Sequence, residues 1–379
     1  MSQSFHQDFK LGILGGGQLG RMLIQSGIDF NIPFTTLDPD AHAPCATLAE
    51  FHNGKLTDFD TVMKFGSACD ILTIEIENVN TKALKALVAQ GKRVFPQPEV
   101  IELIQDKRTQ KMFYRECGIP TADFILTENA NEVRKHPDFL PAVNKLGREG
   151  YDGRGVQILR SASDLDKAFD APGLLEKLID FEKEISVIVA RNQQGEIKTF
   201  PAVEMVFHPV QNLVEYLFAP AEITEPVRKE ADAIACKIIQ ELDMVGLLAV
   251  EMFVTKDGRV LVNEIAPRPH NSGHQTIEAN VTSQYEQHLR AILNLPLGDT
   301  KLILPSAMVN LLGEPEYSGL ARYQGFDEVV KLPGVHVHLY GKKLTKPFRK
   351  MGHVTIVDED IDRLKKKANF VKETLKVIT

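Results

Sequence analysis

The chain has 379 residues, of which 43% are hydrophobic and 25% charged, and its formal net charge is −7. This composition is typical of an ordinary globular protein, and at about 150 residues per domain the length predicts two or three domains. The acidic balance argues against a nucleic-acid-binding protein, and the lack of any run of roughly 18 apolar residues argues against a membrane protein.

The four cysteines (Cys45, Cys69, Cys117 and Cys236) form no CxxC pair. Their wide spacing suits neither a zinc site nor a disulfide framework, so we expect reduced thiols. The first residues, MSQSFHQDFK, lack the pattern of a signal peptide. Together these features predict a cytoplasmic location.

The first 105 residues are predicted to alternate strands with helices. Residues 10–27 predict a strand, a glycine turn and a helix, a second strand ends at Asp38, and residues 69–79 predict a third strand before a helix at 81–91. Such alternation is typical of a parallel sheet covered on both faces.

The turn in this first unit has the pattern G-x-G-x-x-G, at Gly15, Gly17 and Gly20. It would let backbone N–H groups at a helix N-terminus approach a phosphate, and Asp38 would suit a ribose hydroxyl. The pattern alone is weak, because a turn needed only for packing looks the same. An NAD-dependent oxidoreductase is therefore one alternative.

The middle of the chain is predicted to pair strands by short turns, with helices between them. One helix closes at Gly118, another is capped by Ser161 or Ser163, and a third starts at Thr224 and stops at Gly246. The last roughly 80 residues predict a smaller, mostly β unit. It carries a basic finger, YGKKLTKPFRKMGHVTI, at residues 340–356.

The segment NKLGREGYDGRGVQIL, residues 144–159, is rich in glycine and charge. We predict a hairpin tip that acts as a flap, whose free amides fold over a polyphosphate. Lys145 is placed to meet phosphate oxygens, and Arg154 offers a fork for an oxyanion. A solvated hairpin tip with no ligand is the alternative.

Two glutamates are predicted to face each other across a hairpin at residues 249–265. A two-residue turn at Asp257 and Gly258 sets Glu251 opposite Glu264. Two carboxylates so close repel each other between apolar strands. A divalent cation such as Mg²⁺ would remove the conflict, with Asn263 as a further oxygen ligand. One protonated or solvent-facing glutamate is the alternative.

Two further segments carry candidate ligands. IAPRPHNSGH follows Glu264 and offers Arg268 for a small anion, with His270 and His274 as hydrogen-bond donors or ordinary structural residues. EKLIDFEKEISV offers an extended backbone that can read a purine edge and Glu184 for ribose hydroxyls, although an acidic surface loop looks the same.

These features resemble the ATP-grasp superfamily and, within it, the family of 5-(carboxyamino)imidazole ribonucleotide synthases of purine biosynthesis. The residues that carry the resemblance span nearly the whole chain: GILGGGQLGRML at 12–23, EIENV at 75–79, KLGREGYDGRG at 145–155, NEIAPRPHNSGH at 263–274 and RKMGHVTI at 349–356.

The resemblance implies a mixed α/β and α+β fold in three parts. A Rossmann-like preATP-grasp domain covers residues 1–105, an ATP-grasp domain of two subdomains covers 106–300, and a small β-rich domain covers 301–379. It implies a homodimeric ligase that uses ATP and Mg²⁺ or Mn²⁺ to activate bicarbonate as carboxyphosphate. The carboxyl group then passes to the exocyclic amine of 5-aminoimidazole ribonucleotide.

The resemblance also implies a set of site residues. ATP would be held by Arg108, Lys145, Gly150, Tyr151, Asp152, Gly153, Arg154, Gly155, Val156, Glu176, Lys177, Leu178, Ile179, Glu184, Asn263 and Glu264. The metal would be held by Glu251 and Glu264, and bicarbonate would face Tyr151, Arg268 and His270. The ribonucleotide would meet Gln18, Leu19, Glu75, Asn78, Arg154, Lys342 and Arg349.

One departure from the family pattern falls in EMVFHP. Many members have a nucleotide-contacting histidine where Phe207 stands, and His208 comes one position late. Two rivals remain. A formate-dependent phosphoribosylglycinamide formyltransferase tends to have alanine in place of Asn78 and lacks RKMGH, and a catalytically inactive nucleotide-binding protein would not need every one of these residues.

Overall fold

The computed structural model describes residues 9–148, 155–207 and 214–379. The N-terminal part forms the expected parallel sheet, in the order β3-β2-β1-β4-β5. Its strands are β1 (Leu11–Leu14), β2 (Phe34–Asp38), β3 (Glu50–Asn53), β4 (Ile71–Ile74) and β5 (Arg93–Val94). The sequence did not predict β3, whose side chains are mostly exposed and lack a run of apolar residues.

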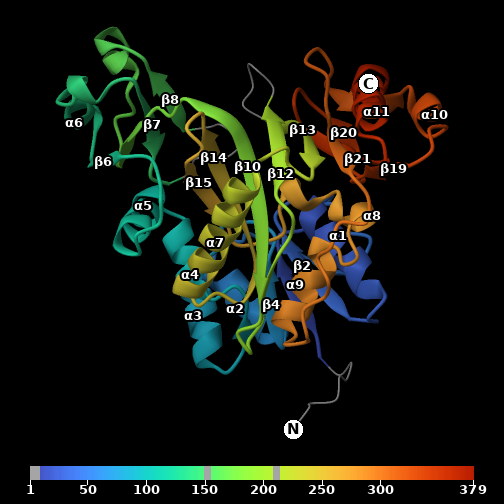
Figure 1. The fold of residues 1–379 in the computed structure, drawn as a ribbon. Helices are drawn as coiled ribbons and strands as arrows, with labels where there is room; N and C mark the ends of the chain where they lie inside the picture. The colour runs from blue at the N-terminus through green and yellow to red at the C-terminus, as the bar shows by residue number, and fades with distance from the viewer. Residues whose placement is uncertain (1–8, 149–154, 208–213) are drawn as a thin grey trace.

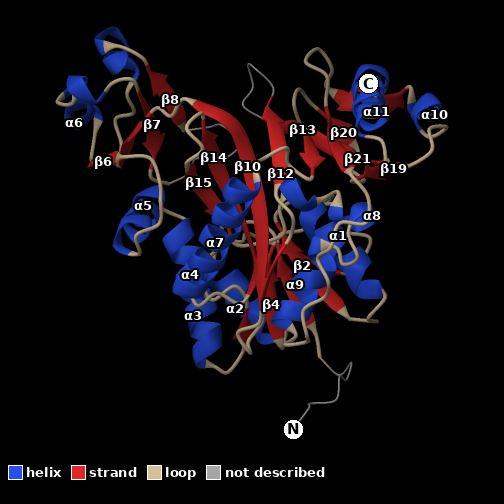
Figure 2. Ribbon diagram, in the orientation of Figure 1, coloured by secondary structure: helices blue, strands red, loops and turns tan. Residues whose placement is uncertain are grey.

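Helices cover both faces of this sheet (Figure 2). On one face α2 (Phe59–Ser67) and α3 (Thr81–Ala89) pack on the strands. On the other face α1 (Gln18–Ile28) packs together with α9 (Gln284–Ile292), which comes from the middle of the chain. The N-terminal unit is therefore fixed to the rest of the molecule through a shared apolar core.

A small four-stranded sheet follows α4 (Pro98–Ile104) and α5 (Lys107–Glu116), in the order β6-β9-β7-β8. Its elements are β6 (Phe124–Thr127), α6 (Ala130–Arg134), η1 (Pro137–Phe139), β7 (Ala142–Leu146), β8 (Val156–Leu159), η2 (Ala162–Lys167) and β9 (Gly173–Lys177). The predicted hairpin is confirmed at its described ends, where Lys145 pairs with Val156. The predicted helix at Ser161 is the short 3₁₀ helix η2, capped by Ser161.

A nine-stranded sheet forms the centre, with long β10 running through the middle of Figure 1. Its order is β15 (Val260–Ala266), β14 (Gly246–Thr255), β10 (Phe181–Arg191), β12 (Val203–Phe207), β13 (Val214–Ala219), β16 (Ser306–Leu312), β21 (Lys350–Val357) and β19 (Val335–Leu339), with β11 (Ile197–Thr199) beside β10. One face packs on α7 (Glu225–Glu241). The predicted stop at Gly246 was wrong, because the helix is capped at Leu242 and Gly246 begins β14.

The last 80 residues join this sheet instead of standing apart from it, since β16 pairs with β13. The remaining elements are α8 (Thr276–Ala279), η3 (Asn271–Gly273), α10 (Phe326–Val329), α11 (Ile361–Thr374), and two strand pairs, β17 (Gly319–Leu320) with β20 (Leu344–Thr345) and β18 (Arg322–Gln324) with β22 (Lys376–Ile378). The sequence analysis missed α11, which buries Leu364, Ala368 and Val371. Within the part that the structure describes, none of the helices has both the length and the apolar character of a membrane span.

Candidate active site

Two glutamates face each other across the hairpin of β14 and β15. The ladder pairs Glu251 with Glu264, as predicted. The turn differs from the prediction, because the N–H of Thr255 donates to the carbonyl of Arg259 (3.0 Å), which leaves a three-residue loop with Gly258 at φ +83°. The pairs near the tip are therefore shifted by one residue from the predicted register.

A β-bulge restores the predicted pairing further along the hairpin. The register shifts between Glu251 and Met252, with Asn263 as the extra residue of β15. Without this shift Glu264 would point to the other face of the sheet. The one-residue shift from the longer turn and the one-residue shift from the bulge cancel. The predicted pairing of Glu251 with Glu264 is therefore confirmed, although the register near the tip differs from the prediction.

A third glutamate lies on the same face. Glu184 of β10 stands opposite Phe253, and Ser186 stands opposite Glu251. Residues that face each other across a ladder share a face of the sheet, so Glu184 and Glu251 point the same way. Burial first, and then the charge of Glu264, raises the pKa of Glu184 to about 8.

The glutamate pair is held in two different protonation states. Burial and the neighbouring charge of Glu264 raise the pKa of Glu251 well above its ordinary value. The ammonium of Lys107, which donates to Oε2 of Glu264, lowers the pKa of Glu264 to about 2. Glu251 also lies 3.4 Å from Nε2 of His270. The pKa values of the two carboxyls are therefore shifted in opposite directions, so Glu264 favours the ionised form and Glu251 the protonated form, as expected for two close carboxylates.

Lys145, the residue before the end of β7, lies beside a buried carboxylate. Its ammonium lies 2.5 Å from Oε2 of Glu176 and donates to Oδ1 of Asn263 (3.1 Å). Lys111 of α5 pairs with the other oxygen of Glu176, and burial lowers the pKa of Lys111 to about 8. The two lysines keep Glu176 ionised, because together they offset the effect of its burial on its pKa.

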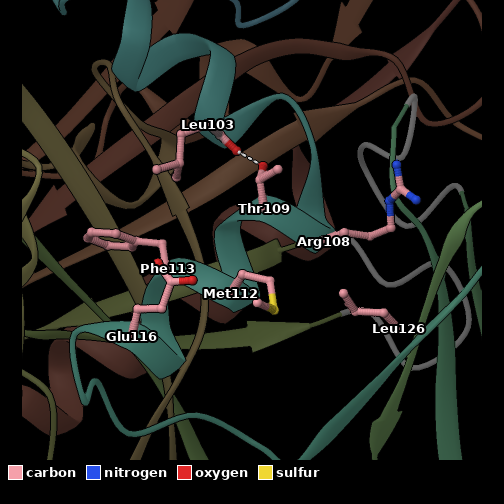
Figure 3. A pocket seen from close by; sticks show the side chains of 7 residues that line it. All are labelled: Leu103, Arg108, Thr109, Met112, Phe113, Glu116 and Leu126. Carbon is pink, nitrogen blue, oxygen red and sulfur yellow. Dashed lines mark hydrogen bonds between the residues drawn. The ribbon is translucent and has the colours of Figure 1, made fainter.

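Arg108 does not join this group. Its guanidinium pairs with Asp106 (3.1 Å) and Glu128 (3.3 Å). Together with Leu103 and Thr109, Arg108 is among the residues that line a surface pocket of about 450 Å³ (Figure 3). The α5 side chain that reaches the glutamate pair is Lys107. The sequence contained a signal for this, because residues 107 and 111 lie one turn apart on the same face of a helix.

Two of the predicted ATP-binding residues use their backbone N–H groups for hydrogen bonds within the protein. The N–H of Lys177 donates to Asp123 (2.8 Å) and that of Leu178 to Pro141 (3.1 Å). Ile179 follows just after β9, and Gly155 and Val156 lie where β8 begins, with Gly155 at φ +70°. The predicted residues Gly150, Tyr151, Asp152, Gly153 and Arg154, and also His208, lie outside the described residues.

Arg268 and His270 follow β15 and face two acids. Nε of Arg268 lies 2.8 Å from Oε1 of Glu77, a partner that the sequence analysis did not assign. His270 caps η3, and its Nδ1 lies 2.9 Å from the hydroxyl of Ser272. Glu251 therefore connects the glutamate pair to the segment that was predicted to hold an anion.

The glycine turn is already filled by carboxylates. Glu75 accepts from the N–H groups of Gly17 (2.7 Å) and Gly20 (2.9 Å), and Asp38 accepts from that of Gly16 (2.7 Å). A side chain at Gly17 would collide with Glu75. These amides point at acids of the protein itself, so the turn is poorly suited to the pyrophosphate of a dinucleotide.

The basic finger reaches this turn. Lys342 donates to Oε1 of Gln18 (2.9 Å) and to the carbonyl of Lys350 (2.7 Å). Arg349 donates to the carbonyl of Leu344 (2.7 Å). Among the other residues assigned to the ribonucleotide, Asn78 is exposed after β4, whereas Leu19 is buried in the core and offers only its backbone.

The carboxylates of this site suit a hard divalent cation whose coordination is completed by oxygen atoms of a bound substrate. Within residues 9–148, 155–207 and 214–379 no group of three or more His, Cys, Asp or Glu side chains is arranged as a closed metal site. Glu251 and Glu264 supply two carboxylates, and 43% of the Glu264 side chain is accessible. Mg²⁺ is usually held by one or two carboxylates plus substrate phosphates, so the residues present fit this ion.

Comparison with protein families assigns most of the chain. The Ribonucleotide synthetase preATP-grasp domain matches residues 9–105, the ATP-grasp domain matches 112–285, and the Phosphoribosylaminoimidazole carboxylase C-terminal domain matches 306–367.

Three relatives cover nearly the full length. The N5-carboxyaminoimidazole ribonucleotide synthase of Synechococcus elongatus is 40% identical over 91% of this chain and 89% of its own. The structure of the N5-carboxyaminoimidazole ribonucleotide synthetase from Thermotoga maritima is 41% identical, with a TM-score of 0.89 over 98% of this chain and 99% of its own. The structure of the Aspergillus clavatus synthase in complex with ADP and 5-aminoimidazole ribonucleotide is 31% identical, with a TM-score of 0.88 over 97% of this chain and 99% of its own.

Proposed function

The chain belongs to the family of N5-carboxyaminoimidazole ribonucleotide synthases, ATP-grasp enzymes of purine biosynthesis, and on this premise we propose how its residues divide the work. The observation that carries the proposal is the glutamate pair on one face of β14 and β15, with Lys107 and Lys145 beside it. The two carboxylates could hold a cation, and the two lysines could contact phosphate groups. Phosphoryl transfer requires both kinds of group in one place.

We propose that the reaction proceeds through carboxyphosphate. An oxygen of bicarbonate attacks the γ-phosphorus of ATP, and ADP leaves. The exocyclic amine of 5-aminoimidazole ribonucleotide then attacks the carboxyl carbon, and phosphate departs. The site would have to exclude water while carboxyphosphate is present, because this intermediate hydrolyses when it is exposed.

The nucleotide end of the site would be built around Lys145. Lys145 and Lys107 would meet the phosphate oxygens and stabilise the charge that moves during transfer. Glu184 would accept hydrogen bonds from the ribose, and the backbone at 176–179 would read the adenine edge. Glu251 and Glu264 would hold Mg²⁺ or Mn²⁺, which supplies neutralisation of phosphate charge when bound.

The carboxylation end would lie between Arg268 and the basic finger. Arg268 and His270, with Tyr151, would orient bicarbonate, and Arg268 would be positioned by its contact with Glu77. The ribonucleotide would lie near Gln18, Glu75 and Asn78, with its 5′-phosphate on Lys342, Arg349 and Arg154, since a cationic finger suits a phosphate dianion. The contact of Lys342 with Gln18 supports this grouping.

Further expectations concern the whole protein. We propose that it is a cytoplasmic homodimer, and light scattering coupled to size-exclusion chromatography tests the oligomeric state. The division into domains at residues 105 and 300 also stays a proposal.

An assay of phosphate release tests the function. We expect phosphate to appear with ATP, Mg²⁺, bicarbonate and 5-aminoimidazole ribonucleotide together, and a carboxylated ribonucleotide to form. Replacing bicarbonate by formate, and the substrate by glycinamide ribonucleotide, tests the formyltransferase alternative. Turnover with formate and none with bicarbonate would contradict the proposal.

A further inference from the structure

Three imidazole rings form a stack between the body of the molecule and its basic finger. The ring of His353 lies between those of His338 and His274, with centroids 4.4 Å and 4.6 Å away and interplanar angles of 7° and 27°. His338 and His353 are direct cross-strand partners in β19 and β21. We call these three residues the histidine stack. Two of them stand in the segments NEIAPRPHNSGH and RKMGHVTI, and the mechanism uses neither.

Each ring of the stack is fixed by a side-chain partner. The hydroxyl of Tyr340 lies 3.0 Å from Nδ1 of His353, and that of Tyr285 lies 2.8 Å from Nδ1 of His274. Both hydrogen-bonded pairs are almost fully buried. At the outer end Nε2 of His338 lies 2.6 Å from Oε1 of Glu278. Hydrogen bonds at the ring edges set the ring planes as well as their separation.

The buried rings are suited to remain neutral. Burial, together with neighbouring cationic groups, holds the pKa of His274 and of His353 well below the ordinary value for histidine. Neutral rings stack without charge repulsion. These two buried rings therefore suit a structural link better than a proton carrier.

The stack joins the two substrate ends of the proposed site. His274 ends the segment that carries Arg268 and His270, proposed for bicarbonate. On the other side, Tyr340 begins the basic finger, and the ammonium of Lys342 lies 5.5 Å from the centroid of the Tyr340 ring. The helix α8, which carries Glu278, contacts β21 and lies next to it in Figure 1.

We propose that the histidine stack sets the position of the basic finger relative to the bicarbonate segment, with His353 as the central positioning residue. This inference rests on the proposed function for the identity of the two substrates. Because one rigid group holds both segments, a change at His353 displaces both subsites together. The hydrogen-bonding partners of the stack are Tyr340, Tyr285 and Glu278, and these three lie outside the strands β7, β9 and β14 of the ATP site.

Steady-state kinetics of His353→Ala tests the inference. We expect the KM for 5-aminoimidazole ribonucleotide and the KM for bicarbonate each to rise at least about fivefold, while the KM for ATP stays within about twofold. The variant His353→Phe keeps a flat ring in the stack and loses only the bond to Tyr340. We expect it to recover most of both losses.

A matched control separates positioning from general destabilisation. Val354 is the next residue of β21 and is fully buried in the apolar core on the other face of the sheet. Val354→Ala should lower the Tm and leave all three KM values unchanged. A rise in only one substrate KM for His353→Ala, unchanged values, or equal losses in the Ala and Phe variants would overturn the inference. Failure of the wild-type protein to carboxylate the ribonucleotide would instead overturn the proposed function.

Discussion

Glu251 and Glu264 belong to one pair, yet their surroundings differ. Lys107 donates to Glu264 and keeps it ionised, whereas Glu251 is more deeply enclosed and keeps its proton. With Glu251 protonated, the two glutamates and Lys107 together carry no net charge. The two acids can therefore lie close together in the sheet without a bound ion. A cation that binds together with a phosphate group would displace the proton of Glu251 and weaken the ion pair between Lys107 and Glu264. Metal binding is then expected to release a proton.

The first prediction concerns Glu264. Glu264→Gln removes one proposed metal ligand and the partner of Lys107, so we expect kcat at ordinary Mg²⁺ to fall at least about 100-fold, with partial recovery at high Mg²⁺. Phosphate release measured against Mg²⁺ concentration checks this. Glu182→Gln, at an exposed position of β10, is the control and should behave as wild type. Full turnover of Glu264→Gln at ordinary Mg²⁺ would show that the metal assignment is wrong.

A second prediction concerns the pH dependence of stability without ATP or metal. The pKa of Glu184 is raised from 4.5 to about 8 in the folded protein, chiefly by burial. Between these values the folded state holds a proton that the unfolded chain releases. The protonated Glu184 therefore contributes to the stability of the folded state. This contribution is fully present below about pH 4.5 and is lost as the pH rises through about 8.

The variant Glu184→Gln has no such proton to lose. We expect the free energy of unfolding to fall less steeply between pH 5 and 8 than in the wild type, by at most about 1.4 kcal/mol per pH unit. Urea unfolding in EDTA at several pH values measures this difference. Glu182→Gln should keep the wild-type slope, and an unchanged slope in Glu184→Gln would contradict the assigned pKa.

At the scale of elements, the hairpin of β14 and β15 shows how two small irregularities act together. The three-residue loop at its tip shifts the ladder by one residue, and the bulge at Asn263 shifts it back. The bulge also brings the amide of Asn263 beside Glu264, where it accepts from Lys145. The position of Glu264 therefore depends on the bulge more than on the turn.

Single deletions at the turn and at the bulge both keep Glu251 opposite Glu264, so they test whether the site also needs the side chain of Asn263. Removing Lys256 leaves a two-residue Asp-Gly turn, which antiparallel hairpins favour, so we expect kcat to stay within about twofold of wild type. Removing Asn263 also leaves Glu264 opposite Glu251, but it abolishes the contact with Lys145, and we expect kcat to fall at least about tenfold. Both variants should retain the far-UV circular dichroism of the wild type. Equal kcat values in the two variants would mean that the contact of Asn263 with Lys145 is not needed.

The elements that the sequence predicted best were those with strong local signals. Thr224 and Pro226 marked the start of α7, the alternation of strands and helices gave the parallel sheet, and the Asp-Gly pair located the hairpin. The assignment of Arg108 to ATP stays a prediction, whereas the contact of Lys107 with Glu264 was not predicted, because helical spacing was not applied to that segment. The partnership of Glu77 with Arg268 joins residues 191 positions apart in sequence, and no local pattern indicates it.

At the scale of the whole molecule, the central sheet crosses the predicted boundary at residue 300. The strand β13 pairs with β16 from Tyr216 opposite Val309 to Ala219 opposite Ser306. The sequence analysis expected a smaller, mostly β unit there and did not predict this pairing, because apolar periodicity shows that a strand exists but not which strand it pairs with. The helix α11 was missed for a related reason, since its buried face packs on β16 and β21 of this sheet and on α10.

A truncation tests the dependence of the sheet on its C-terminal strands. A chain ending at residue 300 lacks β16 and exposes the edge of β13 with its hydrogen-bonding groups unpaired. We expect this fragment to aggregate when expressed alone and to stay in solution when residues 301–379 are expressed with it. Sedimentation of the two preparations checks this. A monomeric fragment 1–300 with the Tm of the full chain would contradict the expectation.

The junction of β13 and β16 also sets an order of events on the ribosome. The edge of β13 emerges long before its partner, because about 90 residues of chain separate the two strands. During that interval the nascent protein presents an open sheet edge to every other chain in the cell, and a chaperone that shields such edges would act on it then. Translation pauses between residues 220 and 306 would lengthen this exposure, so the yield of the protein should depend on the codons used there even when the amino-acid sequence is unchanged.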